Sequence, residues 1–225
     1  MRENRSGKIS KKYMRQLITI AIPKGRLLIP IIKLFDEAGI SLNVREKKYG
    51  YKLSNGSFDL LIRIYKNRDI PKLVSRGICE MGFASSDWIA EEGTELRKML
   101  ETDIGSVKLV AAVHRTWNEK MFDKKRFTCA TEYVNLAKNF FNKIQVSAKI
   151  IKTHGASESY VPCWADIIID TCETGRSLKE NDLIIWKELF NSTVWLVAKP
   201  RLNKQKIIYI EEFAQKICQV LTTKS

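Results

Sequence analysis

The segment IIIDTCETGRSL, residues 167–178, carries the strongest structural signal in the chain. Its three consecutive isoleucines end at Asp170 and predict a buried strand, because strands covered on both faces read as continuous apolar runs. The Thr174-Gly175 pair predicts a tight turn, and the residues after it predict the start of a helix. A strand, a turn and a helix in this order indicate an α/β fold.

The same pattern recurs outward from this segment. Residues 17–22 predict a strand, Pro23-Lys24-Gly25 predicts a turn, and residues 27–38 predict a helix that ends at Gly39. Further strands are predicted at 60–64, 81–84, 107–113, 127–130, 149–152 and 194–198, and further helices at about 71–76, 86–92, 134–141, 178–181 and 211–221. This alternation favours mostly parallel sheets covered by helices, in one large domain or in two lobes joined by crossing strands.

Composition and charge narrow the classes of partner. The chain has 225 residues, of which 44% are hydrophobic and 28% charged, as in an ordinary globular protein. Its net charge of +14 favours partners rich in phosphate. The positive residues are spread along the chain, which argues against a dedicated nucleic-acid surface. Residues 1–16 hold six basic residues and one acid, which predicts a basic flexible arm.

The cysteine and histidine content excludes several kinds of site. Five cysteines without a CxxC pair favour a reducing compartment, and hence a cytoplasmic protein. His114 and His154 are the only two histidines, so no metal site is predicted from a side-chain cluster. No apolar run reaches the roughly 20 residues needed to cross a bilayer, so we expect no membrane segment.

The turn after the 167–170 strand has the chemistry of a sugar-phosphate site. Thr174, Gly175, Arg176 and Ser177 would offer backbone N–H groups and hydroxyls to a phosphate, and Leu178 would complete the turn. The carboxylates of Asp170 and Glu173 would accept hydrogen bonds from the hydroxyls of a ribose. The alternative is an ordinary strand-turn-helix unit with a Thr or Ser cap.

Cations suited to a second, polyphosphate group lie in other parts of the chain. Lys24 and Arg26 project from the first βα turn and would neutralise pyrophosphate or a triphosphate during transfer, which makes them the candidate catalytic residues. Arg63, at a strand end, is a weaker third candidate. Each of the three has the alternative of being a solvated surface cation.

Several ordered motifs resemble those of one family. DTCETGRSLKENDL, residues 170–183, is similar to the phosphoribosyl-pyrophosphate loop of the ATP phosphoribosyltransferases. ITIAIPKGRL, residues 18–27, resembles that family's opening strand and turn. The remaining matches, in the family's order, are RDIP at 68–71, GICEMG at 77–82, Asp87, ATEY at 130–133, IIK at 150–152, Gly155 and Glu158.

The resemblance implies a fold and an activity. The family has two α/β lobes of the periplasmic-binding-protein type II architecture, with the active site between them. The lobes would comprise residues 17–104 plus 188–225 and residues 105–187, the second carrying the phosphoribosyl-pyrophosphate loop. The implied reaction transfers the 5-phosphoribosyl group of phosphoribosyl pyrophosphate to N1 of ATP with Mg²⁺, releases pyrophosphate, and begins histidine biosynthesis.

The resemblance also implies partners and further site residues. The length matches the short form of the family, which works with a histidyl-tRNA-synthetase-like regulatory subunit, so a hetero-oligomer built on a dimer or higher oligomer is expected. Asp87 and Glu158, which fall in the family's motifs, are further candidates for binding ATP or pyrophosphate, together with the cations Lys52 and Arg63.

Three positions depart from the family pattern. Tyr51 stands where the family has an arginine, and Ser86 and Glu132 stand where it has lysines. Lys47, Lys48 or Lys52 would then have to supply charge in place of the arginine. Two alternatives stay open: a phosphoribosyltransferase paralogue with another acceptor, and a non-catalytic nucleotide-binding regulatory protein.

Overall fold

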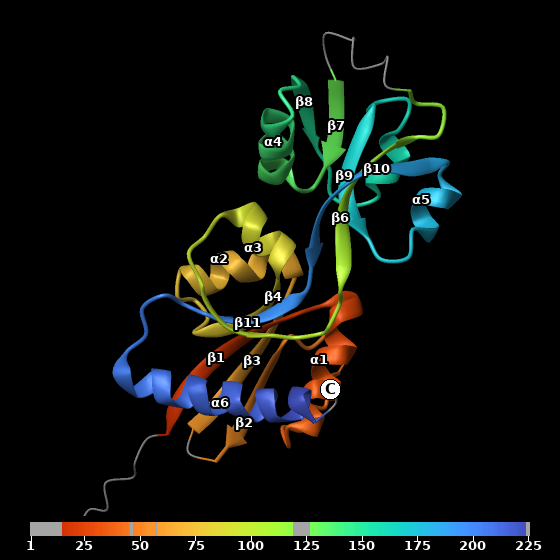
Figure 1. Cartoon of the computed structure of the whole chain (residues 1–225). Helices are drawn as coiled ribbons and strands as arrows, with labels where there is room; N and C mark the ends of the chain where they lie inside the picture. The colour runs from red at the N-terminus through yellow and green to blue at the C-terminus, as the bar shows by residue number, and fades with distance from the viewer. Residues whose placement is uncertain (1–14, 46, 57, 119–126, 224–225) are drawn as a thin grey trace, which may run out of the picture.

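The computed structural model describes residues 15–45, 47–56, 58–118 and 127–223, which form two α/β lobes stacked end to end (Figure 1). Each lobe is built on its own sheet, six-stranded in the lower lobe and five-stranded in the upper one. Residues 1–14 of the expected basic arm, 1–16, lie outside the described residues, and Gln16 already belongs to β1. The predicted two-lobed α/β fold is thus confirmed.

The lower lobe has the strand order β2-β3-β1-β4-β11-β5. Only the pairs β1–β3 and β1–β4 are parallel, so the sheet is mixed, with antiparallel strands at its flanks. Its strands are β1 (Gln16–Pro23), β2 (Gly50–Asn55), β3 (Phe58–Tyr65), β4 (Met81–Ser85), β5 (Arg97–Glu101) and β11 (Val194–Ala198). Its helices are α1 (Leu28–Glu37), α2 (Ile70–Ser75), α3 (Ser86–Glu92) and α6 (Lys204–Thr222).

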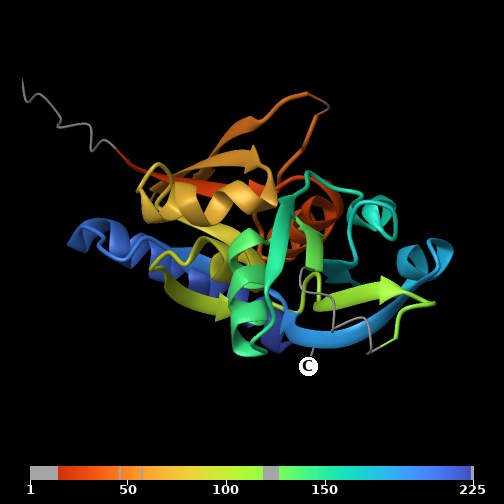
Figure 2. The ribbon, with the colours of Figure 1, turned by 90° about the horizontal axis from the view of Figure 1, so that it is seen from above.

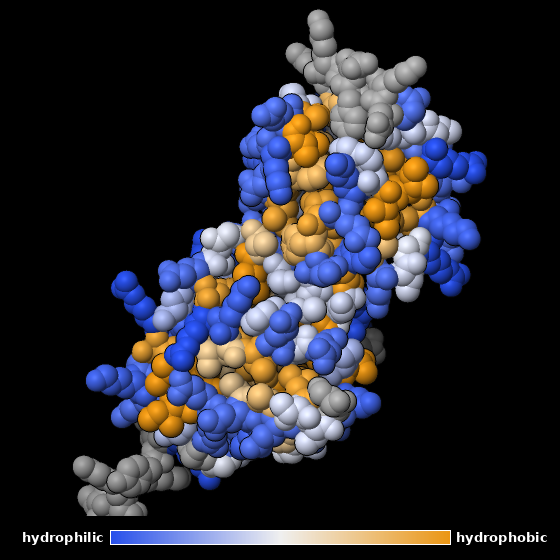
Figure 3. All heavy atoms as spheres, in the orientation of Figure 1, coloured by the Kyte–Doolittle hydropathy of each residue, from blue (hydrophilic) through white to orange (hydrophobic). Residues whose placement is uncertain are grey.

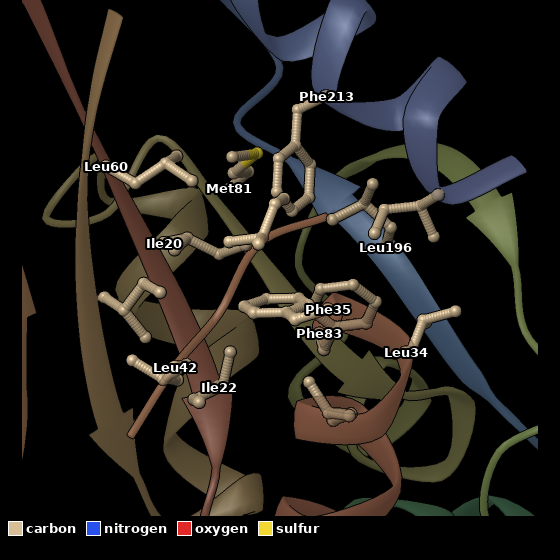
Figure 4. Close-up of a cluster of buried hydrophobic side chains, with 14 of the residues drawn as sticks. Ile20, Ile22, Leu34, Phe35, Leu42, Leu60, Met81, Phe83, Leu196 and Phe213 are labelled. Carbon is tan, nitrogen blue, oxygen red and sulfur yellow. The ribbon is translucent and has the colours of Figure 1, made fainter. Parts of the chain in front are cut away.

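Alternation along β1 divides the lower lobe into two layers. Ile18, Ile20 and Ile22 face a core closed by α1 and α6, whereas Ala21 faces α2. Figure 4 shows this core, in which Phe35 of α1 lies 5.6 Å from Phe83 of β4 and 5.7 Å from Phe213 of α6, measured between ring centroids. Burying aromatic rings in such tilted and edge-on pairs fixes both helices on one face of the sheet.

The upper lobe has the strand order β10-β6-β9-β7-β8. Its parallel part comprises β9, β7 and β8, and β6 and β10 pair antiparallel beside them (Figure 2). Its strands are β6 (Val107–His114), β7 (Phe127–Thr131), β8 (Ala148–Lys152), β9 (Ile167–Cys172) and β10 (Leu183–Ser192). Its helices are α4 (Val134–Lys143), α5 (Arg176–Glu180) and the 3-10 turn Ser157–Tyr160.

The chain crosses between the lobes twice, before β6 and after β10. Thr102 binds the carbonyl of Val194 through its backbone N–H (2.9 Å) and its hydroxyl (2.7 Å), and Val194 N–H donates to Ile104 (3.2 Å). The boundary expected at residue 188 falls inside β10, which pairs with β6 as far as Ser192. We therefore propose that the upper lobe ends at Ser192.

On the face shown in Figure 3, hydrophilic and hydrophobic residues are intermixed on both lobes. An apolar patch lies over the β10 region of the upper lobe, the strand on which Ile184 and Ile185 are exposed. Among the described residues, no helix is long and apolar enough to span a membrane.

Candidate functional site

The turn between β9 and α5 forms the floor of an open cavity of about 360 Å³. Gly175 lies in this turn with φ 75° and ψ 2°, a left-handed conformation that favours glycine. The predicted residues Glu173, Thr174, Arg176 and Ser177 line the cavity together with Gly175. Leu178 instead packs into the upper core at 5% exposure, so only its backbone is available to a ligand.

The lower lobe contributes one side chain to the described lining of this cavity. Arg26, from the 3-10 turn that precedes α1, lines the same cavity, and its Nη1 lies 3.1 Å from Oε2 of Glu173. Both side chains are about half exposed, so the ion pair itself adds little stability. Its significance is geometric: a cation of the first βα turn and the loop after β9 meet at one site between the lobes.

Asp170 follows the three isoleucines of β9 and precedes the 173–177 loop that lines the cavity. Burial raises the pKa of its carboxyl to about 6, against the opposing effects of hydrogen bonds from the Thr171 N–H (2.7 Å) and the Ser157 hydroxyl. The negative charges of Glu158 and Glu132 raise this pKa further. Glu158 is therefore near enough to Asp170 to act on its carboxyl, but it does not line the cavity.

The other predicted cations lie elsewhere. Lys24 is exposed at the start of the same turn as Arg26 but does not line the cavity. Lys52 pairs with Asp59 at 3.1 Å on the β2–β3 hairpin. Arg63 lies across Gly50 of β2, where its Nη1 is 3.0 Å from the point a β-carbon would occupy. The structure thus brings Arg26, but neither Lys52 nor Arg63, to the cavity.

The side chains of Asp87 and Tyr51 both make hydrogen bonds within the protein. Asp87 is only 3% exposed, and its carboxylate accepts hydrogen bonds from Tyr133 and Ser192. The hydroxyl of Tyr51 accepts the N–H of Arg45 and lies within bonding distance of the carbonyls of Arg45 and Lys48. Tyr51 therefore anchors the loop before β2, and we propose a structural role for Asp87 in place of the predicted ligand role.

Sequence reasoning missed one ion pair between the lobes. Arg68, in the RDIP motif, donates from Nη1 to Oε1 of Glu132 at 2.9 Å, and both side chains are partly buried. Arg68 belongs to the lower lobe and Glu132 to the upper one, so a second ion pair connects the lobes. The opposite charges of Arg68 and Glu132 are compatible with an ion pair, but no sequence pattern predicts contact between positions 64 residues apart.

The described residues hold no group of three or more histidine, cysteine or acidic side chains arranged to bind a metal ion. Among the described residues that line the cavity, the carboxylates are those of Glu173 and of Glu180, which pairs with Arg176 at 2.8 Å. Asp170 does not line the cavity but directly precedes its lining residue Thr171.

Comparison with known proteins identifies the family of this chain. A family model described as ATP phosphoribosyltransferase matches residues 66–222. The ATP phosphoribosyltransferase of Methanopyrus kandleri is 34% identical over 197 residues, which are 85% of this chain and 69% of the relative. The chain belongs to the ATP phosphoribosyltransferase family. The relative from Thermoanaerobacter sp. is 30% identical and matches 92% of this chain and 97% of its own length.

Solved structures agree on the fold. The ATP phosphoribosyl transferase (HisG:HisZ) complex from Thermotoga maritima superposes with a TM-score of 0.80 at 24% identity, covering 92% of this chain and 99% of the other. The arginine-binding protein ArgBP of the same organism gives 0.55 at 10% identity, covering 93% and 96%. The two-lobed architecture is therefore that of the ATP phosphoribosyltransferases and of binding proteins.

Membership of the ATP phosphoribosyltransferase family gives the activity. The chain is a transferase that catalyses the first step of histidine biosynthesis, in which the phosphoribosyl group of phosphoribosyl pyrophosphate is transferred to ATP.

Proposed function

We propose that phosphoribosyl pyrophosphate binds in the cavity above the β9–α5 turn and transfers its sugar to N1 of ATP across the cleft. The observation that carries this proposal is the convergence of Arg26 and the 173–177 loop on one cavity from opposite lobes. The loop offers hydroxyls and backbone N–H groups to the 5-phosphate, and Asp170 and Glu173 offer acceptors to the ribose hydroxyls.

The transfer reaction depends on stabilising the charge that develops on the leaving group more than on a covalent nucleophile. The bond from C1 to pyrophosphate breaks as the bond from N1 of adenine to C1 forms, so negative charge grows on the leaving group. Arg26 is placed at the cavity and Lys24 precedes it by two residues, so the same turn supplies two cations. We assign both the role of stabilising the departing pyrophosphate, with Arg26 as the closer of the two to the loop.

Mg²⁺ fits this site as a companion of the substrate phosphates. Protein-bound Mg²⁺ is commonly held by one or two carboxylates together with phosphate oxygens. Asp170 and Glu173 are the carboxylates that would hold it, and the ion would neutralise charge on the pyrophosphate. The 173–177 loop nevertheless provides most of the binding to phosphoribosyl pyrophosphate, and Arg26 acts chiefly on the pyrophosphate as it departs.

The raised pKa of Asp170 predicts a pH dependence of phosphoribosyl-pyrophosphate binding. Below about pH 6 the carboxyl is protonated and loses acceptor capacity, so affinity should fall by up to about tenfold per pH unit and level off above pH 6. Calorimetry between pH 5 and pH 8 measures this. Asp170→Asn is the control, because it leaves only the titration of the ligand's own phosphates; equal slopes in both proteins would exclude the role of Asp170.

A regulatory partner belongs to the proposal. The Thermotoga maritima structure contains a HisG:HisZ complex, and we propose that this chain likewise works in the cytoplasm with a synthetase-like subunit, as a dimer or higher oligomer. The Tyr51 hydroxyl hydrogen-bonds the backbone of Arg45 and Lys48, and the Glu132 carboxylate pairs with Arg68. The residues at positions 51 and 132 therefore add no positive charge to the cavity. A neighbouring subunit that supplies or positions a cation would restore it.

The experiment is a pyrophosphate-release assay with ATP and phosphoribosyl pyrophosphate, with and without the partner. We expect slow turnover by the chain alone and at least tenfold faster turnover with the partner. Full activity of the chain alone would contradict the dependence on a partner. Absence of turnover in both, despite tight phosphoribosyl-pyrophosphate binding, would favour a paralogue with another acceptor.

A further inference from the structure

A buried hydrogen-bonded chain runs from α3 of the lower lobe to the strand that carries Asp170. The hydroxyl of Tyr133, just after β7 of the upper lobe, donates to Oδ2 of Asp87 at 2.6 Å. The hydroxyl of Ser192, at the end of β10, donates to the other oxygen, Oδ1, at 2.9 Å. Asp87 therefore binds the upper lobe at two places, one of which is a strand that leads into a crossing segment.

The chain continues through Thr131 to β9. The backbone N–H of Tyr133 donates to Oγ1 of Thr131 at 2.9 Å, and that hydroxyl donates to the carbonyl of Ile169 at 2.5 Å. Ile169 directly precedes Asp170. Asp87, Thr131, Tyr133 and Ser192 are each no more than 3% exposed, so these bonds form out of water, where losing one is costly.

Neighbouring contacts fix α3 against α4 around this chain (Figure 1). The carboxylate of Glu91, which is 7% exposed, accepts the backbone N–H groups of Asn135 and Leu136 in the first turn of α4, at 2.9–3.0 Å. Trp88 stacks on Tyr133 with ring centroids 4.5 Å apart. Burial and the charge of Asp87 raise the pKa of Tyr133, so its hydroxyl keeps the proton that it donates.

We propose that Asp87 and Tyr133 are positioning residues that set the Asp170 end of β9 against the Lys24–Arg26 turn of the other lobe. The reaction needs groups from both lobes at one carbon, and a misplacement of about 1 Å can cost about 10²-fold in rate. The 173–177 loop lies within one lobe, so initial binding of phosphoribosyl pyrophosphate depends less on this contact than the transfer does. This inference rests on the proposed function of the site.

Tyr133→Phe tests the inference, because it removes the hydroxyl and keeps the ring on Trp88. We expect kcat to fall about 10- to 100-fold in the complex with the partner, with Kd for phosphoribosyl pyrophosphate within about threefold of the wild-type value. Tyr209→Phe is the matched control, since it removes the same atom from a tyrosine of α6 packed on Phe58 and should leave kcat unchanged. Unchanged kcat in Tyr133→Phe would overturn the proposal, even if the melting temperature falls.

Small-angle scattering of the same proteins separates this inference from the proposed function. Without the Asp87–Tyr133 bond the lobes should sample wider arrangements, and the radius of gyration should rise relative to wild type and Tyr209→Phe. Asp87→Ala, which removes both acceptor oxygens, should give the same result. Failure of the wild-type protein to bind phosphoribosyl pyrophosphate would contradict the proposed function, whereas identical scattering of all variants would contradict the positioning role whatever the activity.

Discussion

Replacing Gly175 with valine should weaken binding of phosphoribosyl pyrophosphate by about 10²-fold or more, because several charge-assisted hydrogen bonds from one turn are lost together. At φ 75° a β-branched residue is strained, so the turn must change its backbone conformation. Within the described part of the chain and apart from the two adjoining residues, the one atom within 4 Å of a β-carbon at this position is the Cys172 sulfur at 3.8 Å, so the fold itself has room for the side chain. Calorimetry with phosphoribosyl pyrophosphate and Mg²⁺ measures the loss.

Gly39→Val is the control for this substitution. Gly39 has nearly the same φ, 73°, and no described residue other than its chain neighbours lies within 4 Å of its β-carbon position. It lies beyond the end of α1 that is distant from the Lys24–Arg26 turn. It should lower the unfolding free energy by a similar amount, about 1–3 kcal/mol, and leave the affinity intact. Wild-type affinity in Gly175→Val would place the phosphoribosyl site elsewhere.

Replacing Lys24 and Arg26 with alanine should lower kcat by about 10²-fold for each residue that contacts the leaving pyrophosphate in the transition state. The geometry predicts the larger effect for Arg26, since its guanidinium reaches Glu173 across the cavity while Lys24 is not in the cavity wall. Steady-state kinetics with ATP and phosphoribosyl pyrophosphate, in the presence of the partner, measure both parameters.

Arg97→Ala provides the matched control for Arg26→Ala. Arg97 pairs with Glu211 at 2.9 Å on the lower lobe and has a similar exposure, 41% against 49% for Arg26. Its loss should leave kcat unchanged. A rise in KM for ATP alone, with kcat retained, would assign Arg26 and Lys24 to triphosphate binding and exclude the proposed role in pyrophosphate departure.

Much of the fold could be predicted from periodicity and turn residues. The 167–170 isoleucine run and the 18–22 run lie in β9 and β1, and the helix expected at 86–92 is α3. The missed strands, β2, β5 and β10, carry charged or exposed residues at sheet flanks, where pairing with a neighbour determines the structure more than hydrophobicity does. α6 begins at Lys204, earlier than expected, because Asn203 caps it by accepting from Gln205 N–H.

The site was predictable where its residues are contiguous. The 170–178 turn and the Lys24–Arg26 turn each form within a single βα unit, so local sequence located both. The roles of Asp87 and Glu132 could not be read locally, because their partners, Tyr133 and Arg68, lie on the opposite lobe. The sequence alone does not show whether an acidic residue binds a ligand or connects two lobes, because only its packing in the fold distinguishes these roles.

The identity of the nucleotide product tests the central claim most directly. The chain and its partner are incubated with ATP, phosphoribosyl pyrophosphate and Mg²⁺, and the product is analysed by mass spectrometry. The account predicts ATP carrying one added 5-phosphoribosyl group at N1, in equal amount to the pyrophosphate released. Pyrophosphate release without phosphoribosylated ATP, or transfer only to a different acceptor, would contradict it.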